Sequence, residues 1–246
     1  MLRSSALVPI SDQVAGGLHT SEDASGDAYA FTSALAAAAS RLGVSFRYGT
    51  PIQTVRVAGR VVRGVVCGGE TLVADNYVVA CGTGTSALLR SIGLGLPIYP
   101  VQGVSITLSV SDWPQRPAMP VRDPTLRVAI TPFADRLRVA GMAILNGGDL
   151  TIKPQHIATL RHSVREVFPR LPPDTPAAAW SGVRPMTPDG PPIIGRTRYD
   201  NLFVNAGHGP LGWTLSCGSA DVLASMIESR EAAIAVAPFA ADRYRV

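Results

Sequence analysis

The chain has 246 residues, of which 46% are hydrophobic and only 16% are charged, and its formal net charge is +4. This length allows about one or two domains and is enough to bury a core. Of the 22 basic residues only Lys153 is a lysine, and the arginines are scattered along the chain. Scattered arginines fit codon bias better than an anion-binding surface, so we do not expect nucleic-acid binding.

Neither the cysteines nor the histidines are spaced like metal ligands. The three cysteines form no C-x-x-C pair, and the four histidines lack zinc-ligand spacing. An odd number of cysteines is typical of reduced, mostly buried thiols in a cytosolic protein. No apolar run reaches about 18 residues, and residues 1–10 do not resemble a signal peptide, so we expect no membrane-spanning helix.

The first third of the chain predicts a helix followed by a small antiparallel layer. Asp27 can cap the helix and Gly43 can end it. The apolar residues expected on its buried face are Phe31, Leu35, Ala38 and Leu42. Short strand-like runs follow at 44–48, 51–59, 60–69 and 70–75. Residues 76–93 then predict a buried strand, a glycine turn and a helix.

The middle of the chain predicts an antiparallel sheet and one helix. Residues 98–145 contain β-rich runs separated by proline-containing loops. Pro154 suits the first turn of the helix that follows. The expected buried stripe of this helix is Ile157, Leu160, Val164 and Val167.

The last third returns to α/β character. It contains a Pro-Asp-Gly turn at 188–190, a buried strand at 201–207 and a helix at 210–230. The predicted fold class is therefore α/β with α+β mixture, with an antiparallel sheet inserted into a discontinuous domain.

The sequence "GHGPLG" at 207–212 fits the Gly-x-Gly-x-x-Gly spacing of dinucleotide-binding turns. A strand, a glycine turn and a helix N-terminus present unpaired amides and a favourable dipole to an anion. Gly207, Gly209 and Gly212 would also allow close packing of helix on strand, and spacing alone does not decide between these roles. Ala80, Cys81 and Gly82 end an earlier strand in the same way. Two such turns along one sheet edge fit a long, phosphate-containing ligand.

Two further residues are candidates for contact with a substrate. Arg184 lies in a strand-like segment before Pro185 and is either a salt-bridged surface residue or a bidentate ligand for a carboxylate. His208 lies inside the glycine turn, where it contacts a substrate or cofactor, or simply occupies a strained turn position.

These segments together resemble bacterial D-amino acid dehydrogenases (the small subunit), within the D-amino acid oxidase-like family of FAD-dependent oxidoreductases. The resemblance covers about residues 3–230, and its most specific block is 180–220. The other matching stretches are 16–27, 43–52, 77–89, 98–108 and 128–145.

The resemblance implies non-covalent FAD and oxidation of D-amino acids to imino acids, which hydrolyse to 2-oxo acids and ammonia. It implies hydride transfer from the substrate α-carbon to the flavin. Arg184 would bind the substrate carboxylate, and His208 is the second residue assigned to the catalytic site. The implied cofactor-binding residues are Ile52, Ala80, Cys81, Gly82, Gly182, Gly207, Gly209, Leu211, Gly212, Trp213 and Thr214.

The resemblance also implies a domain plan. An incomplete FAD-binding domain would comprise 19–96 and 181–232, and a substrate domain of antiparallel strands would comprise 1–18 and 97–180. Residues 233–246 would form a C-terminal tail. The implied location is cytoplasmic with peripheral attachment at the inner face of the cell membrane, where a quinone of the respiratory chain would accept electrons.

One departure from the family pattern is large. Family members begin with a βαβ unit that has its own Gly-x-Gly-x-x-Gly, and nothing before Gly16 resembles it. We therefore expect "GHGPLG" to form the far wall of a flavin site and a separate N-terminal FAD-binding segment to be a partner. The alternatives are a truncated fragment without catalysis of its own, and an enzyme similar to glycine or sarcosine oxidases.

Overall fold

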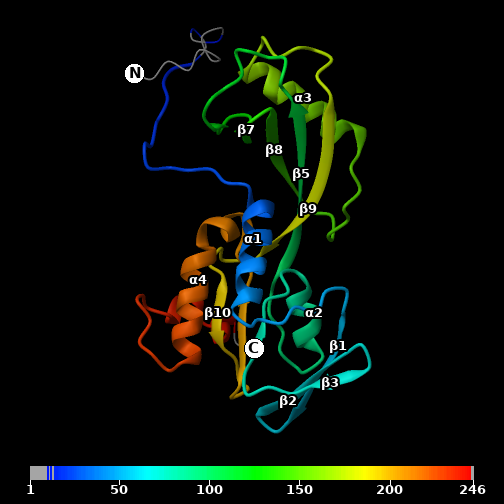
Figure 1. Cartoon of the computed structure of the whole chain (residues 1–246), viewed down its shortest axis with the longest axis vertical. Helices are drawn as coiled ribbons and strands as arrows, with labels where there is room; N and C mark the ends of the chain where they lie inside the picture. The colour runs from blue at the N-terminus through cyan, green and yellow to red at the C-terminus, as the bar shows by residue number, and fades with distance from the viewer. Residues whose placement is uncertain (1–9, 11, 13, 245–246) are drawn as a thin grey trace. The chain divides into compact units, whose positions relative to one another are not determined.

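The computed structural model describes residues 10, 12 and 14–244, and Figure 1 shows its elements. The chain divides into two compact units, one of Met1–Ala38 with Gln102–Gly182 and one of Ala39–Val101 with Val183–Val246. The division into a FAD-binding domain and a substrate domain, with the boundaries given above, stays a prediction. The portion of the predicted substrate domain at residues 1–9 lies outside the described residues.

The first unit is built on one sheet covered by one helix. The sheet has the strand order β6-β7-β8-β5-β9, and the β6–β7, β7–β8 and β8–β5 pairs are antiparallel. Helix α3 lies against β7 and β8 (Figure 1). The elements are β5 (Tyr99–Ser109), β6 (Val121–Asp123), β7 (Val128–Phe133), β8 (Arg136–Ile144), β9 (Ala177–Met186) and α3 (Pro154–Val167).

The predicted stripe of α3 supplies the core between helix and sheet. Leu160, Val164 and Val167 are buried, and Ile157 packs against the same cluster. The helix approaches β8 closely at Gly141, because a Cβ there would lie 3.2 Å from Leu160 Cδ2. The predicted antiparallel sheet and its helix are confirmed.

The second unit contains two small sheets. Sheet A has the order β1-β2-β3, and the other sheet has the order β10-β11-β4, with β11 antiparallel to β10 and parallel to β4. The strands are β1 (Ile52–Ala58), β2 (Val61–Cys67), β3 (Glu70–Leu72), β4 (Tyr77–Val79), β10 (Ile193–Arg196) and β11 (Leu202–Ala206). The helices are α2 (Gly84–Arg90), α4 (Gly212–Ile227) and the short 3₁₀ turns η2 (Gly209–Leu211), η3 (Ala237–Phe239) and η4 (Ala241–Tyr244).

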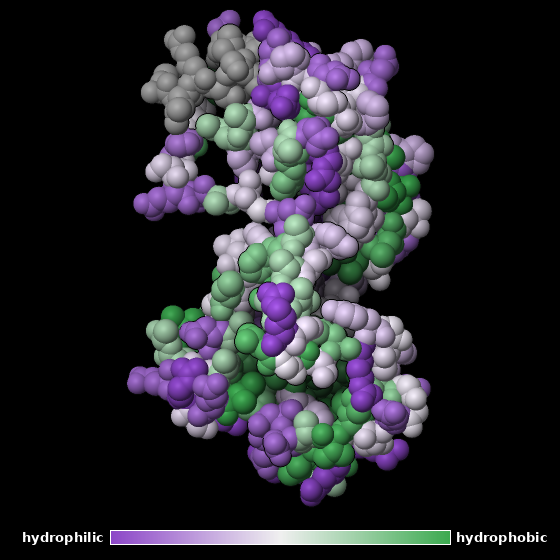
Figure 2. Space-filling model, in the orientation of Figure 1, coloured by the Kyte–Doolittle hydropathy of each residue, from purple (hydrophilic) through white to green (hydrophobic). Residues whose placement is uncertain are grey.

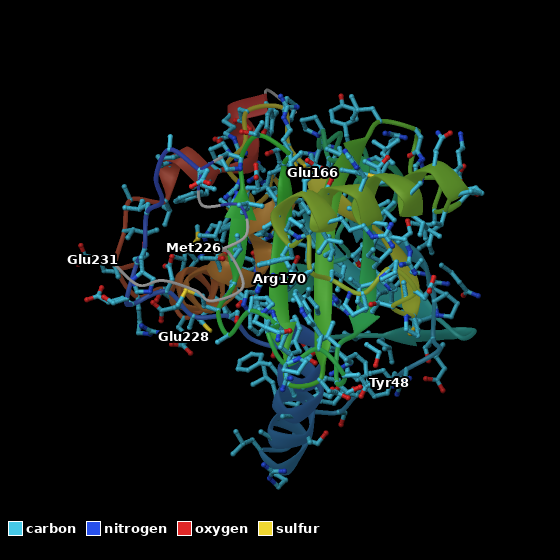
Figure 3. All side chains as sticks on the ribbon, turned by 90° about the horizontal axis from the view of Figure 1, so that it is seen from above. Tyr48, Glu166, Arg170, Met226, Glu228 and Glu231 are labelled. Carbon is cyan, nitrogen blue, oxygen red and sulfur yellow. The ribbon has the colours of Figure 1, made fainter. Side chains whose placement is uncertain are left out.

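Helix α4 packs directly on the sheet that contains β10. Gly195 has φ +126°, and a Cβ there would lie 2.7 Å from Met226 Cε near the C-terminal end of α4 (labelled in Figure 3). Phe203 and Val222 belong to the small core between this sheet and the helix. The mixed α/β class predicted from the sequence is confirmed.

Helix α1 (Ala28–Arg41) forms as predicted but is not buried as predicted. Asp27 Oδ1 accepts hydrogen bonds from the amides of Tyr29 and Ala30 at 3.0 and 3.1 Å, and Gly43 ends the helix with φ +93°. The expected burial is wrong, since no residue of α1 is buried and Leu35 is 55% exposed. In Figure 2 the surface over α1 is mostly pale green and white, so an apolar helix faces outward.

The strand predicted at residues 44–48 is also not formed. Val44, Phe46 and Tyr48 alternate with polar residues as in a strand, yet all three are exposed. Phe46 and Tyr48 stack on each other with ring centroids 5.6 Å apart (Tyr48 is labelled in Figure 3). A strand needs a hydrogen-bonding partner, and among the described residues none pairs with this segment.

The expectation of mostly buried thiols is wrong for two of the three cysteines. Cys67 is buried at the end of β2, whereas Cys81 and Cys217 are exposed, one in the turn after β4 and one on α4. Within the part of the chain that the structure describes, no helix combines the length and apolar character needed to cross a bilayer.

Replacing a buried leucine of the first unit should cost far more stability than replacing an exposed one. Leu137 is 0% exposed in the core of the sheet, so we expect Leu137→Ala to lower the free energy of unfolding by about 2–5 kcal/mol. Leu145→Ala makes the same chemical change at a residue that is 84% exposed, and its effect should stay within about 0.5 kcal/mol. Urea denaturation of both variants tests this, and equal losses would contradict the described core.

Candidate functional site

Parallel pairing of β4 with β11 brings two glycine turns to one edge of a sheet. Leu202 pairs with Tyr77, and Val204 pairs with Val79. Because the strands run in the same direction, the turn at Ala80–Gly82 and the turn that starts at Gly207 leave the same edge. Ligands of open α/β sheets bind at the carboxyl ends of such strands. The placement predicted for the two turns is confirmed.

The turn at 207–212, which we call the glycine bend, is closely packed from behind. Gly207 has φ +79°, and a Cβ there would lie 2.7 Å from Thr187 Cγ2. Gly209 has φ +54°, and its Cβ would lie 2.8 Å from Met186 Sδ. Both glycines are thus required by backbone conformation and by the neighbouring residues 186–187. These two positions are thus explained by packing against the end of β9 and the loop after it, and not by the packing of helix on strand that the spacing also allowed.

A hollow of about 310 Å³ lies between the glycine bend, the end of β11 and the first turns of α4. The hollow is lined mainly by glycine and by small or polar residues, together with one proline and one histidine. The residues are Pro185, Asn205, His208, Gly209, Gly212, Ser216 and Ser219. Asn205 Oδ1 is buried and accepts no hydrogen bond from the described residues. A buried acceptor without a donor costs free energy, so an N–H or O–H brought within reach of this oxygen would be stabilising.

His208 is held in a defined position beside this hollow. Its Nε2 lies 3.0 Å from Ser219 Oγ on α4. Burial lowers the pKa of His208 below its ordinary value of 6.5, so the imidazole is neutral at pH 7. A neutral imidazole can donate one hydrogen bond and accept another without adding a charge.

The N-terminus of α4 has no side-chain cap. Leu211 precedes the helix without a capping hydrogen bond, and the first turn contains no acidic residue. Its first amides and the positive end of the helix dipole therefore suit a negatively charged or hydrogen-bond-accepting ligand. The helix exposes Trp213 (43%) on this turn, and Leu211 before it is 55% exposed.

The strand that carries Arg184 runs to the glycine bend. Met186, the last residue of β9, forms an antiparallel bridge with His208, and Pro185 lines the hollow. Arg184 is two residues before Met186 and is partly buried. Strand alternation places Arg184 and Met186 on the same face of β9. The backbone that carries the predicted carboxylate ligand therefore lies beside the bend.

Two predicted cofactor ligands are not brought to this hollow. Ile52 is the first residue of β1, in a separate sheet, and is 42% exposed. Gly182 belongs to the first unit, where the indole ring of Trp180 lies against the space that a Cβ would fill. The absence of a side chain at Gly182 therefore has a local explanation. Thr214 lies exposed on the first turns of α4.

Sequence reasoning missed Asn205, Ser216 and Ser219. The available signals were a polar residue inside the buried run "LFVNA" and small residues at intervals of three and four along one helix face, Gly212, Ser216 and Ser219. The missing hydrogen-bond donor for Asn205 becomes visible only when the strand and helix are seen together.

Adding a methyl group at Gly207 should destabilise the bend. Gly207→Ala forces an L-residue to φ +79° and into contact with Thr187, so we expect a loss of about 1–3 kcal/mol. Gly218→Ala on α4 is the matched control, because nothing lies within 4 Å of its Cβ position. That variant should be neutral or more stable by up to about 1 kcal/mol, as expected for alanine in a helix. Thermal and urea denaturation measure both, and equal stability of the two variants would contradict the packing of the bend.

The lowered pKa of His208 predicts how stability depends on pH. Below pH 6.5 the unfolded chain binds a proton that folded His208 resists, so stability falls as pH decreases from 6.5 toward the lower pKa of the folded state. His208→Gln should reduce this slope, and His19→Gln, which removes an exposed imidazole far from the bend in sequence, should leave it unchanged. Urea denaturation on both sides of pH 6.5 is the measurement. A slope unaffected by His208→Gln would refute the assignment.

Curated relatives of this chain are proteins named D-amino acid dehydrogenase. The chain is 47% identical over 240 residues to the one from Xanthobacter autotrophicus and 48% identical over 240 residues to the one from Methylobacterium nodulans. In each case the match covers 97% of this chain and 57% of the relative. The chain thus spans little more than half the length of these relatives.

Solved structures of amino-acid oxidases and dehydrogenases share the fold. Glycine oxidase from Geobacillus kaustophilus superposes with a TM-score of 0.77 at 28% identity, covering 86% of this chain and 56% of that chain. L-proline dehydrogenase from P. horikoshii superposes with a TM-score of 0.80 at 18% identity, covering 88% of this chain and 59% of that chain, which shows the fold alone.

The family model described as FAD dependent oxidoreductase matches residues 1–226, which is most of the chain. Together with the relatives and the glycine turns at one sheet edge, this match shows that the chain belongs to the FAD-dependent oxidoreductase family.

Proposed function

We propose that this chain supplies one wall of the FAD site in an enzyme that oxidises D-amino acids. The observation that carries the proposal is the sheet edge at which the turn after β4 and the glycine bend after β11 lie next to each other. FAD is the cofactor of the family, and relatives at 47–48% identity are named D-amino acid dehydrogenase.

The residues at this edge fit such a cofactor. The uncapped first turn of α4 offers amides, and the buried Oδ1 of Asn205 needs a hydrogen-bond donor. Gly82 has φ +54° and nothing within 4 Å of its Cβ position, so a ligand can approach the backbone there. We assign the glycine bend with Leu211, Trp213 and Thr214 to the flavin. The remaining proposed contacts at this edge are Ala80, Cys81 and Gly82.

The substrate-binding role is assigned to Arg184. Its guanidinium has a planar fork of donors that matches a carboxylate in two parallel hydrogen bonds, which fixes the orientation of an amino acid. Neutral His208 donates or accepts a hydrogen bond beside this site and adds no charge. The FAD held by these residues would supply the redox chemistry, as the acceptor for the hydride of the substrate α-carbon. The protein's part is to bind, orient and exclude water.

The proposal includes a second polypeptide segment that completes the site. It corresponds to the part of the curated relatives that this chain does not match. Two features support it: β4 pairs only with β11 among the described strands, and Val78 in the middle of β4 is 44% exposed. The outward apolar face of α1 is a further surface that a covering segment would bury.

The proposed electron acceptor is a quinone of the respiratory chain at the inner face of the membrane. This proposal follows from the resemblance to the family and from the relatives, which are named dehydrogenases. A second candidate activity is oxidation of glycine or sarcosine, which is favoured by the 28% identity to a glycine oxidase. Rates with D-alanine and with sarcosine, each measured with oxygen and with a quinone, distinguish the two.

Flavin titration and one arginine variant test the proposal. The purified chain is titrated with FAD, alone and with the unmatched segment of a D-amino acid dehydrogenase, and flavin fluorescence quenching is measured. We expect tighter binding in the mixture and reduction of the bound flavin by D-alanine. Absence of binding in both samples would remove the proposed cofactor site.

Arg184→Lys keeps the positive charge but loses the paired hydrogen bonds. We expect KM for the D-amino acid to rise about 10- to 100-fold with little change in FAD affinity, the size expected for a charge-assisted contact. Arg60→Lys is the control, because Arg60 lies in an exposed ion pair with Asp200. If Arg184→Lys left KM unchanged, the carboxylate assignment would be wrong.

A further inference from the structure

We propose that Arg243, in the C-terminal tail, is a positioning residue for the glycine bend. It acts through the loop of residues 187–192, which connects β9 to β10. The importance of this loop for catalysis rests on the proposed function, whereas the mechanical coupling does not.

The loop begins and ends beside the glycine bend. Met186 before it bridges to His208, and Ile193 after it pairs with Ala206. Thr187, which is 5% exposed, lies directly behind Gly207, as described above. Any displacement of the loop therefore moves the surface on which the bend rests.

The C-terminal tail binds the middle of this loop through Asp189. Arg243 Nε donates to Asp189 Oδ2 at 2.8 Å and Nη2 donates to Asp189 Oδ1 at 3.4 Å. The Tyr244 hydroxyl donates to the same carboxylate, and the Arg243 guanidinium lies 4.4 Å from the centroid of the Tyr244 ring. Ala241, at the start of η4, is 5% exposed in the core of the second unit. The last residues of the tail are thus held by the burial of Ala241 and, two residues later, by the ion pair of Arg243 with Asp189.

One carbonyl connects the tail to the bend. Arg243 Nη2 donates to Pro191 O at 2.7 Å, and Thr187 Oγ1 donates to the same oxygen at 2.9 Å. The contacts run from Arg243 to Pro191, from Pro191 to Thr187 and from Thr187 to Gly207. Every step is a hydrogen bond or a packed contact within the second unit.

The ion pair between Arg243 and Asp189 is maintained at neutral pH. The hydrogen bond from Arg243 is the largest cause that lowers the pKa of Asp189 to about 2. A carboxylate with a lowered pKa stabilises the folded state above its unfolded pKa of 3.8, and this contribution is lost as pH falls toward 2. The Arg243 side chain is only 16% exposed, whereas Asp189 is 41% exposed.

Amide hydrogen exchange of the full chain tests the coupling without any flavin. We expect Arg243→Gln and Asp189→Asn to raise exchange at residues 205–209 about three- to tenfold, the range for a partly exposed charge-assisted contact. Tyr244→Phe, which keeps the ring, should have a smaller effect. Asp200→Asn is the matched control, because it breaks an ion pair of the same unit without touching the loop.

The series of contacts from Arg243 through Pro191 and Thr187 to Gly207, which we call the relay, is tested by a double-mutant cycle. Thr187→Val keeps the shape of the side chain and removes its hydrogen bond to Pro191. If the relay exists, the effects of Arg243→Gln and Thr187→Val on exchange at 205–209 are not additive. Additive effects overturn it. Unchanged exchange in Arg243→Gln, or an equal rise across β1 and β2, also overturns the proposal.

Flavin binding gives an independent measurement. In the flavin-competent sample, FAD affinity and the visible spectrum of the bound flavin should change in Arg243→Gln and recover only in part in Arg243→Lys, which keeps the charge but not the forked contacts with Asp189 and Pro191. If no sample binds FAD, the proposed function fails, and the exchange data still decide whether the tail positions the bend.

Discussion

The candidate site depends on three parallel residue pairs between β4 and β11. These strands are separated by more than a hundred residues in the sequence, and their pairing carries two glycine turns to a common edge. A parallel ladder is possible here because Tyr77 and Val79 on β4 and Leu202 and Val204 on β11 are buried in one core. If the register slipped by one residue, the half-exposed Val78 of β4 would take the place of its buried neighbours and the turns would no longer align. The position of every residue assigned to the flavin at this edge follows from this register.

The glycine bend packs against neighbouring residues on one side and lines the hollow on the other. Gly207 and Gly209 are needed because Thr187 and Met186 occupy the space that side chains would take. The motif spacing therefore has a structural cause that would operate without any ligand. What distinguishes the site from ordinary close packing is the other side of the bend, where Asn205 and the uncapped first turns of α4 line a hollow. The same few residues thus pack closely on one side and line an accessible hollow on the other.

Local patterns in the sequence were sufficient for most of the elements. The α3 stripe, the Asp27 cap and both strand–turn–helix units follow from periodicity and capping, which depend on neighbouring residues only. Burial of α1 and strand formation at 44–48 were wrong for a common reason, because each requires a partner surface that local patterns cannot supply. The contribution of Asn205 and the role of Arg243 were not predictable either. Both arise from contacts between segments distant in sequence, 189 with 243 being one of them.

The outward face of α1 has a practical consequence. Tyr29 is 84% and Leu42 is 87% exposed on or beside a helix that is rich in alanine. Exposed apolar surface of this kind favours self-association of copies. Among the described strands β4 is an edge strand, and the backbone amides and carbonyls on its outer edge can pair with another copy. We expect the recombinant chain, when it is expressed alone, to form inclusion bodies and to bind dyes that fluoresce on exposed hydrophobic surfaces.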